Sequence, residues 1–356
     1  MNMRQTQYDI ARTWRENLSA TLPAVDSAPA PVRGEWLWCG LPVDSPLGVS
    51  AGPLLNSRWL LYYAELGFDV LVYKTVRSVA RQCYDLPNLV PVSSSQLKNA
   101  EQTLSASSTM NGTWAVSFGM PSQPPDIWQN DIAVARRGLR SGQLLVVSVV
   151  GTQDESITDP NASLDQLADD FAECARRAVD HGAHGIEANF SCPNVATADG
   201  QLFQQPKSAQ QVAERIRDAI GTTPLVLKIG RMNRLEAAEE FVTAVGSYVD
   251  GLAMTNSISA RVVDTDDGLL FDGARRGICG DATRTASIAQ VSLFRNAITN
   301  CGVSMDLVGV GGISAASHVR DYLDAGASSV ALATAAMVDP EVGIKIRREL
   351  SESTFI

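Results

Sequence analysis

The chain has 356 residues, 45% of them hydrophobic, and its 39 acidic and 29 basic residues give a formal net charge of -10. This length and hydrophobic content suffice for a large buried core, so one main domain is the default expectation. The negative charge disfavours nonspecific binding of nucleic acid and makes a small-molecule substrate the better interpretation.

The cysteines and the apolar runs indicate the compartment. Six cysteines stand singly, without the Cys-x-x-Cys or His/Cys spacing of a zinc site, and we expect reduced thiols in a cytoplasmic protein. The first residues lack the continuous apolar core of a secretory signal, and no later run approaches the ~20 apolar residues of a membrane helix. We therefore expect no stable membrane insertion.

Residues 1–42 form a predicted N-terminal extension before the main domain, which we assign to residues 43–356. Its apolar residues predict one amphipathic helix, followed by a Pro/Ala-rich stretch at 23–32. Glu16 and the modest apolar face favour packing against the main domain or a second subunit over a membrane surface. The apolar residues of this helix are Tyr8, Ile10, Trp14, Leu18 and Leu22.

From about residue 47, short β-branched runs alternate with amphipathic segments, as in repeated βα units around a parallel sheet. Most runs are apolar throughout, which is typical of strands covered on both faces. Eight such runs predict an α/β fold, a (β/α)8 TIM barrel. An open doubly wound sheet is the alternative, but Ser50-Ala51-Gly52-Pro53 is not the glycine-rich dinucleotide turn that such a sheet often carries. The runs are 47–52, 70–75, 144–151, 185–189, 225–230, 251–256, 307–312 and 330–334.

The connections between the runs are of two kinds. Apolar residues from Leu164 to Val179 recur at steps of three and four, which predicts a helix with Ser163 as its N-cap. Residues 77–128 and 260–283, in contrast, are too long for turns and follow the second and sixth strands. Because the carboxyl ends of barrel strands form the active-site face, we expect both insertions to shape a substrate pocket.

The fourth run ends in Asn189-Phe190-Ser191-Cys192-Pro193-Asn194, which brings two amides and a thiol to the rim of the barrel. A thiol with a pKa near ~8.5 can exchange protons near neutrality, so Cys192 is the candidate catalytic base. The alternative is a buried structural cysteine. Asn189 and Asn194 each offer a donor and an acceptor, which suits a pyrimidine or flavin edge, although turns also favour Asn.

This hexapeptide strongly resembles the flavin-site motif of the dihydroorotate dehydrogenases, and matching motifs follow in order over roughly residues 43–340. The resemblance implies an FMN-dependent oxidoreductase of pyrimidine metabolism. Such an enzyme oxidises a C–C bond next to a carbonyl, or reduces the corresponding alkene, with Cys192 as acid/base. It also implies a soluble electron acceptor or a quinone, and we expect a homodimer.

Two lysines end barrel strands: Lys74 the second and Lys228 the fifth. An ammonium is costly to bury without a partner, so two at one rim indicate an anionic guest, whereas lysines that reach into water are the alternative. By resemblance, Lys74 lies beside flavin and substrate, and Lys228 stabilises the N1/C2 side of reduced flavin. Asn256 and Ser257, after the sixth strand, match the pair that contacts substrate and flavin.

Glycines after the last strands indicate a phosphate site. Gly311 and Gly312 follow the seventh strand and Thr334 the eighth, where barrels commonly bind phosphate. Gly280 precedes the helix before them, and the lack of a Rossmann fingerprint favours FMN over FAD or NAD. The predicted substrate contacts are Lys74, Asn189, Asn194, Asn256 and Ser257, and the predicted FMN contacts are Ala51, Gly52, Lys74, Thr75, Asn189, Lys228, Gly280, Gly311, Gly312 and Thr334.

Three positions depart from the family pattern. Val116 stands where the second-strand insertion usually carries an Asn that reads the substrate, and an isopropyl group forms no hydrogen bond. Ala333 replaces a glycine beside the phosphate threonine, and Cys279 replaces a serine. These departures support two alternatives: an ene-reductase or dihydropyrimidine-type enzyme for a less polar substrate, and a flavin-binding protein that has lost catalysis.

Overall fold

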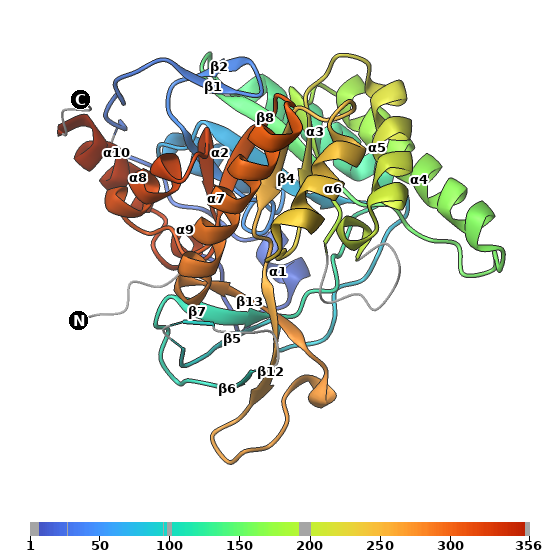
Figure 1. Cartoon of the computed structure of the whole chain (residues 1–356). Coiled ribbons are helices and arrows are strands. Elements are labelled where there is room, and N and C mark those ends of the chain that lie inside the picture. The colour runs from blue at the N-terminus through green and yellow to red at the C-terminus, as the bar shows by residue number, and fades with distance from the viewer. Residues whose placement is uncertain (1–6, 27, 95, 98–101, 192–200, 353–356) are drawn as a thin grey trace.

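The computed structural model describes residues 7–26, 28–94, 96–97, 102–191 and 201–352. Its centre is a closed barrel of parallel strands in the order β3-β4-β8-β9-β10-β11-β14-β15 (Figure 1). This confirms the predicted α/β barrel, and each predicted run overlaps one strand. Six of the strands end two or three residues earlier than predicted, because the residues that follow them already belong to the loops of the rim. The strands are β3 (Leu47–Val49), β4 (Val70–Val76), β8 (Leu144–Val149), β9 (Gly185–Asn189), β10 (Leu225–Lys228), β11 (Gly251–Met254), β14 (Asp306–Val310) and β15 (Ser329–Leu332).

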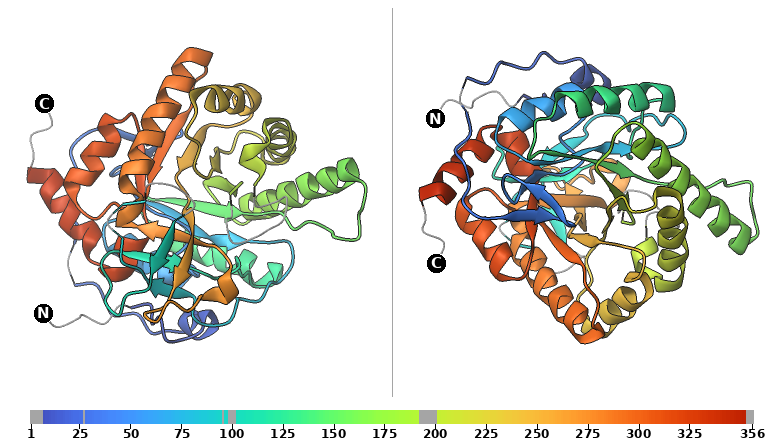
Figure 2. Two further views of the ribbon diagram at one scale, coloured as in Figure 1. Left: turned by 60° about the horizontal axis from the view of Figure 1, so that its bottom comes forward. Right: turned by 90° about the horizontal axis from the view of Figure 1, so that it is seen from above.

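A ring of helices surrounds the barrel, as the view along its axis shows (Figure 2, right). The outward side chains of the strands and the apolar faces of these helices form one large buried cluster. Helix α4 extends beyond this ring (Figure 2, left). The helices are α2 (Ser57–Glu65), α3 (Pro125–Gly138), α4 (Pro160–Asp180), α5 (Pro206–Ile220), α6 (Leu235–Val245), α7 (Arg284–Cys301), α8 (Ala316–Asp324), α9 (Thr334–Val338) and α10 (Val342–Glu352), with short η2 (Leu202–Gln204), η3 (Phe271–Gly273) and η4 (Asp281–Thr283).

The start of α4 corrects the predicted N-cap. Asp159, not Ser163, caps the helix, since its carboxylate accepts a hydrogen bond from the Ala162 N–H at 2.8 Å. Pro160 fits the first helical position because it has no N–H to satisfy. Ser163 lies one turn further in and accepts a hydrogen bond from Gln153.

The inward side chains of the barrel form a second, smaller apolar cluster. Trp38 closes this cluster at the amino-terminal end, where it is 2% exposed. It comes from a hairpin of β1 (Trp36–Trp38) and β2 (Leu41–Val43). A Cβ on Gly185 would lie 2.5 Å from the Trp38 ring, so the plug and the strand fit closely. The barrel therefore has a filled base, and its carboxyl-terminal rim is the end available to a ligand.

The two predicted insertions come together as a five-stranded sheet in the order β5-β7-β13-β12-β6, which stands beside the rim (Figure 1). The sequence analysis described them only as long connections, because strands of three to six residues give little periodicity. Pairing between the insertions, such as Val116 with Gly277, creates a separate apolar cluster. The strands are β5 (Leu89–Pro91), β6 (Thr103–Ser105), β7 (Thr113–Val116), β12 (Ile258–Val263) and β13 (Arg276–Gly280).

The N-terminal segment packs on the barrel through a helix that is much shorter than predicted. Helix α1 covers only Trp14–Leu18, because a capping box between Thr13 and Glu16 fixes its first turn and Ser19 ends it. The Asn17 carbonyl accepts a hydrogen bond from the Trp59 indole at 3.1 Å, which docks α1 on α2. In the part of the chain that the structure describes, no helix has the length and apolar character to cross a bilayer.

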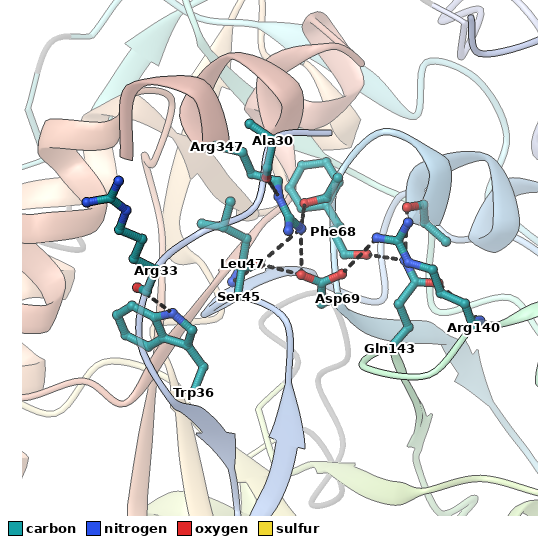
Figure 3. Close-up of polar contacts among 12 residues, drawn as sticks. Ala30, Arg33, Trp36, Ser45, Leu47, Phe68, Asp69, Arg140, Gln143 and Arg347 are labelled. Atoms are coloured by element: carbon teal, nitrogen blue, oxygen red, sulfur yellow. Dashed lines mark hydrogen bonds and ion pairs between the residues drawn. The ribbon is translucent and has the colours of Figure 1, made fainter. Parts of the chain in front are cut away.

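A buried charge network ties both ends of the chain to the base of the barrel (Figure 3). The Asp69 carboxylate is fully buried and accepts hydrogen bonds from Arg347 and Ser45, both at 2.6 Å. Arg347, on α10, also donates to the Ala30 carbonyl at 2.7 Å. Burial raises the pKa of Asp69, and the charge of Arg347 opposes that shift. Arg347 is therefore the main counter-charge of Asp69, and Arg140 is a second cation 3.6 Å from the other carboxylate oxygen.

We expect Arg347→Met to lower the free energy of unfolding by about 3–5 kcal/mol, because it leaves the buried Asp69 carboxylate without its main cation. Arg348→Met, on the exposed side of the same helix, is the control and should change stability by less than about 0.5 kcal/mol. Urea unfolding of both variants measures the difference. Equal effects would contradict this account of the network.

His184 joins α4 to β9 with a ring nitrogen that acts as an acceptor. Its Nδ1 accepts a hydrogen bond from the Leu145 N–H at 2.8 Å, so this nitrogen must be unprotonated. Burial lowers the pKa of His184 from 6.5 to about 4, and the charge of Arg136 adds to the shift. Because the folded pKa lies below the unfolded one, the unfolded chain binds more protons between these values.

The stability contributed by His184 should therefore be present above pH 6.5 and be lost as the pH falls toward 4. We expect the difference in unfolding free energy between the wild type and His184→Ala to shrink across this range. Urea titrations at several pH values measure it, and the titration of shared carboxylates cancels in the difference. A difference that stays constant or grows on acidification would show that His184 is not held neutral.

Candidate functional site

Two cavities meet at the carboxyl-terminal rim of the barrel. The first has a volume of about 250 Å³ and the second about 160 Å³. Both are lined by the ends of barrel strands and by the five-stranded sheet. The two insertions, which form this sheet, thus help to line the cavities, as the sequence analysis expected. The cavities are contiguous, because both are lined by Asn256, Cys279, Val310, Ala333 and Thr334.

Every predicted site residue within the described part of the chain lines one of these cavities. Cys192 and Asn194 lie outside the described residues. The first cavity is lined by Gly280, Gly311 and Gly312; the second by Ala51, Gly52, Lys74, Thr75, Asn189, Lys228 and Ser257; and Asn256 and Thr334 line both.

The glycines of the first cavity are required by their backbone conformations. Gly312 has φ +67°, and a Cβ there would lie 2.7 Å from the Arg284 Cβ. At Gly280, with φ +103°, a Cβ would lie 2.0 Å from the Gly112 carbonyl oxygen. Only glycine fits both positions without a shift of the neighbouring chain. Bare backbone consequently faces the cavity, as in sites where a phosphate approaches the main chain.

A network of amides fixes the end of β9 in the second cavity. The Asn189 side-chain oxygen accepts hydrogen bonds from the Ser191 N–H at 3.2 Å and from the Asn256 amide at 3.4 Å. Asn256 also donates to the carbonyl and the hydroxyl of Ser191. Asn189 and Asn256, which are far apart in the sequence, therefore hold the backbone that leads directly into Cys192.

Gln290 on α7 fixes the ends of the two strands beside this network, and the sequence analysis missed it. Its amide donates to the Gly230 carbonyl at 2.7 Å. Its side-chain oxygen accepts from the Met232 N–H at 3.1 Å and from the Thr255 hydroxyl at 3.3 Å. A polar residue on the buried face of a predicted helix was the available signal.

Two cations and a neutral thiol set the electrostatics of the second cavity. Lys74 and Lys228 both line it, and none of its described lining residues is acidic. The Lys228 ammonium lies 3.8 Å from a carboxylate oxygen of Glu187, and both side chains are buried. Burial raises the pKa of Cys279 to about 11, although Lys228 opposes the shift, so this thiol stays protonated near neutrality. The cavity suits a guest that carries or develops negative charge.

Several other residues of the second cavity were not predicted. Ser50 is buried there, and its hydroxyl forms no hydrogen bond within the described structure. Trp14 brings helix α1 of the N-terminal segment into the wall. Phe118, from the first insertion, makes that wall apolar together with Val116, which the sequence analysis had already placed where the family pattern has a substrate-reading Asn. Trp14 lay in a predicted helix and Phe118 in a long connection, but neither pattern says which surface the segment contacts, so their convergence on the site depended on tertiary packing.

Comparisons with known proteins agree with this arrangement. A profile of the family described as "Dihydroorotate dehydrogenase" matches residues 131–354. The chain is 32% identical over 361 residues to a dihydroorotate dehydrogenase of Dictyostelium discoideum, covering 95% of each chain. It is 30% identical over 186 residues to the catalytic subunit of dihydroorotate dehydrogenase B (NAD(+)) of Bacillus pumilus, covering 51% of this chain and 57% of that subunit.

A solved structure is similar over most of the chain. It is the crystal structure of the dihydroorotate dehydrogenase of Eimeria tenella in complex with ferulenol, with a TM-score of 0.70. The match covers 89% of this chain and 83% of that one at 17% sequence identity. At this identity the likeness concerns the fold, and it agrees with the closed barrel described above.

Proposed function

This chain belongs to the dihydroorotate dehydrogenase family, and we propose that it oxidises dihydroorotate with bound FMN as the hydride acceptor. As a member of this family it is an oxidoreductase that acts on CH–CH groups. The comparisons favour this activity over the ene-reductase and non-catalytic alternatives. The observation that carries the proposal is the continuity of the two cavities, which join a glycine-lined site to a cavity with two lysines.

The residues present fit FMN. The first cavity offers bare backbone at Gly311 and Gly312 to a phosphate, beside Thr334. The second offers apolar walls for a flat ring and polar groups at its edges. The buried Ser50 hydroxyl, which has no hydrogen-bond partner among the described residues, is explained if a ring edge reaches it. When bound, FMN would supply the two-electron chemistry that protein side chains lack.

The chain's own residues would then bind the substrate and move its proton. Lys74 would balance the substrate carboxylate, and Asn189 and Asn256 would orient its amide edges. Cys192 would remove the proton next to the carbonyl. Supporting this role, Asn256 fixes the Ser191 carbonyl and hydroxyl directly before Cys192. The five-stranded sheet beside the rim would limit access of water to the reacting atoms.

The cellular setting forms part of the same proposal. The free state of the described cysteines supports a cytoplasmic location. Electrons would pass to a soluble acceptor or a quinone, and the name of the Bacillus pumilus relative includes NAD(+). The homodimer stays a prediction from the sequence.

We expect the purified protein to carry FMN and its absorbance to bleach when dihydroorotate is added without oxygen. Cys192→Ser should keep the flavin but slow this bleaching by about 10²–10⁴-fold, the usual loss when a general base is removed. Cys301→Ser, on the outer end of α7, is the matched control and should bleach at the wild-type rate. Stopped-flow absorbance measures all three proteins.

Three results would contradict parts of this proposal separately. A protein that cannot be reconstituted with FMN would contradict the cofactor. FMN that is bleached by another activated compound but not by dihydroorotate would contradict the substrate. A Cys192→Ser variant that bleaches as fast as the wild type would contradict the base.

Gly312→Ala should weaken FMN binding at least tenfold, because the added methyl forces the chain of the first cavity to move away from Arg284. Gly302→Ala is a matched control with a similar φ of +64° and no atom within 4 Å of the added Cβ. Both changes carry a similar backbone strain of about 1–2 kcal/mol. Only the first should raise the dissociation constant in a fluorescence titration with FMN. Equal FMN dissociation constants for the two variants would show that Gly312 does not form part of the phosphate site.

A further inference from the structure

We propose that Glu187 is a positioning residue that holds Lys228 below the second cavity and weakens the positive field that Lys228 presents to the flavin. This inference rests on the proposed FMN site. It concerns a carboxylate that does not line either cavity, so it acts through the lysine.

The strand pattern places both side chains inside the barrel. On β9, Ile186 and Ala188 belong to the outer apolar cluster, so Glu187 projects to the opposite, inner side. On β10, Leu227 belongs to the same outer cluster, so Lys228 also projects inward. The two strands are adjacent and parallel. In this register Glu187 is opposite Val226, so Lys228 lies diagonally across from it on the same inner face.

Burial makes each of these charges dependent on the other. The side chains of Lys228 and Glu187 are 8% and 5% exposed, and Glu187 lies between its strand partners Ser148 on β8 and Val226 on β10. A charge is costly to bury in such surroundings without a partner. Among the described residues, the only ion pair that either side chain forms is with the other.

The distance between the two charged groups shows what kind of interaction joins them. At 3.8 Å the ammonium and the Glu187 Oε1 attract each other without a hydrogen bond. The same oxygen forms no hydrogen bond with any described residue. The N–H donors of Lys228 consequently remain available to a ligand in the cavity that the lysine lines. Glu187 thus reduces the charge of the site without blocking the cation.

The ion pair should affect the equilibrium between oxidised and reduced flavin. Reduction adds negative charge to the ring, and the two lysines favour that charge. Since none of the described lining residues of the second cavity is acidic, Glu187 is the carboxylate that moderates Lys228. Removing its charge should therefore favour the reduced state of bound FMN.

The test is an equilibrium titration of bound FMN against a reference dye at pH 7, with wild type and Glu187→Gln. We expect the ratio of reduced to oxidised flavin at a fixed dye ratio to rise about tenfold in Glu187→Gln, the size expected for one buried charge at an effective dielectric constant near 20. Glu173→Gln, which removes the charge of a half-buried carboxylate on the outer helix α4, is the control and should leave the ratio unchanged.

The double variant tests whether the effect passes through the lysine. In a Lys228→Gln background there is no ammonium for Glu187 to hold or offset, so adding Glu187→Gln should change the ratio by much less than it does in the wild type. Glu187→Asp keeps the charge but moves it away from the ammonium, and should give a smaller rise than Glu187→Gln. This variant retains a carboxylate, so it serves if Glu187→Gln folds poorly.

Two results would overturn the inference in a protein that binds FMN: an unchanged or lower ratio in Glu187→Gln, or an equal rise with and without Lys228. A colourless protein that FMN cannot restore would instead overturn the proposed cofactor. The two failures are therefore distinguishable. Because the ratio is an equilibrium property of the flavin, a general loss of stability or turnover would not reproduce the expected pattern.

Discussion

The closure of eight parallel strands into one barrel is the constraint on which the rest of the structure depends. Closure leaves no free strand edge and forces alternate residues of every strand inward. Apolar inner residues and the Trp38 plug fill the base, which leaves the carboxyl-terminal rim for polar groups. Lys74, Asn189 and Lys228 can thus come from three different strands and still line one cavity. Their convergence follows from strand register and needs no long-range pairing of the side chains themselves.

The barrel and most of its rim could be predicted, because a polar residue at the end of an apolar run shows in the sequence itself where a strand ends. A polar residue directly after an apolar run, such as Lys228 or Asn256, must lie at the rim once the fold is known. The short strands of the insertions could not be predicted, since Val116 and Gly277 pair only through contacts more than 150 residues apart. Helix α1 was predicted too long because apolar spacing from Tyr8 to Leu22 resembled a helix. The capping box at Thr13 and the buried Asn17 limit it instead.

The three departures from the family pattern affect the candidate site to different extents. Ala333 has a negative φ of -134°, so this position does not need the left-handed conformation that favours glycine. Cys279 stays protonated near neutrality and adds no charge where a serine is usual. Val116, however, lines the second cavity with an isopropyl group. Two of the departures are therefore compatible with an intact flavin site, and the third concerns how the substrate is held. Recognition of a polar substrate would then depend more on the amides of Asn189 and Asn256.

The two ends of the barrel each bury a carboxylate with a cation, and their geometries imply different roles. At the base, Asp69 accepts hydrogen bonds from both Arg347 and Ser45 through its Oδ2, while its Oδ1 lies 3.6 Å from Arg140 without a hydrogen bond, so the carboxylate joins distant parts of the chain. At the rim, Glu187 stands 3.8 Å from Lys228, and its Oε1 has no hydrogen-bond partner among the described residues. A buried pair that served stability alone would gain by closing this gap, because only good geometry repays the cost of desolvating both charges. The open geometry of the second pair is therefore better explained by a cation that is kept available for a ligand.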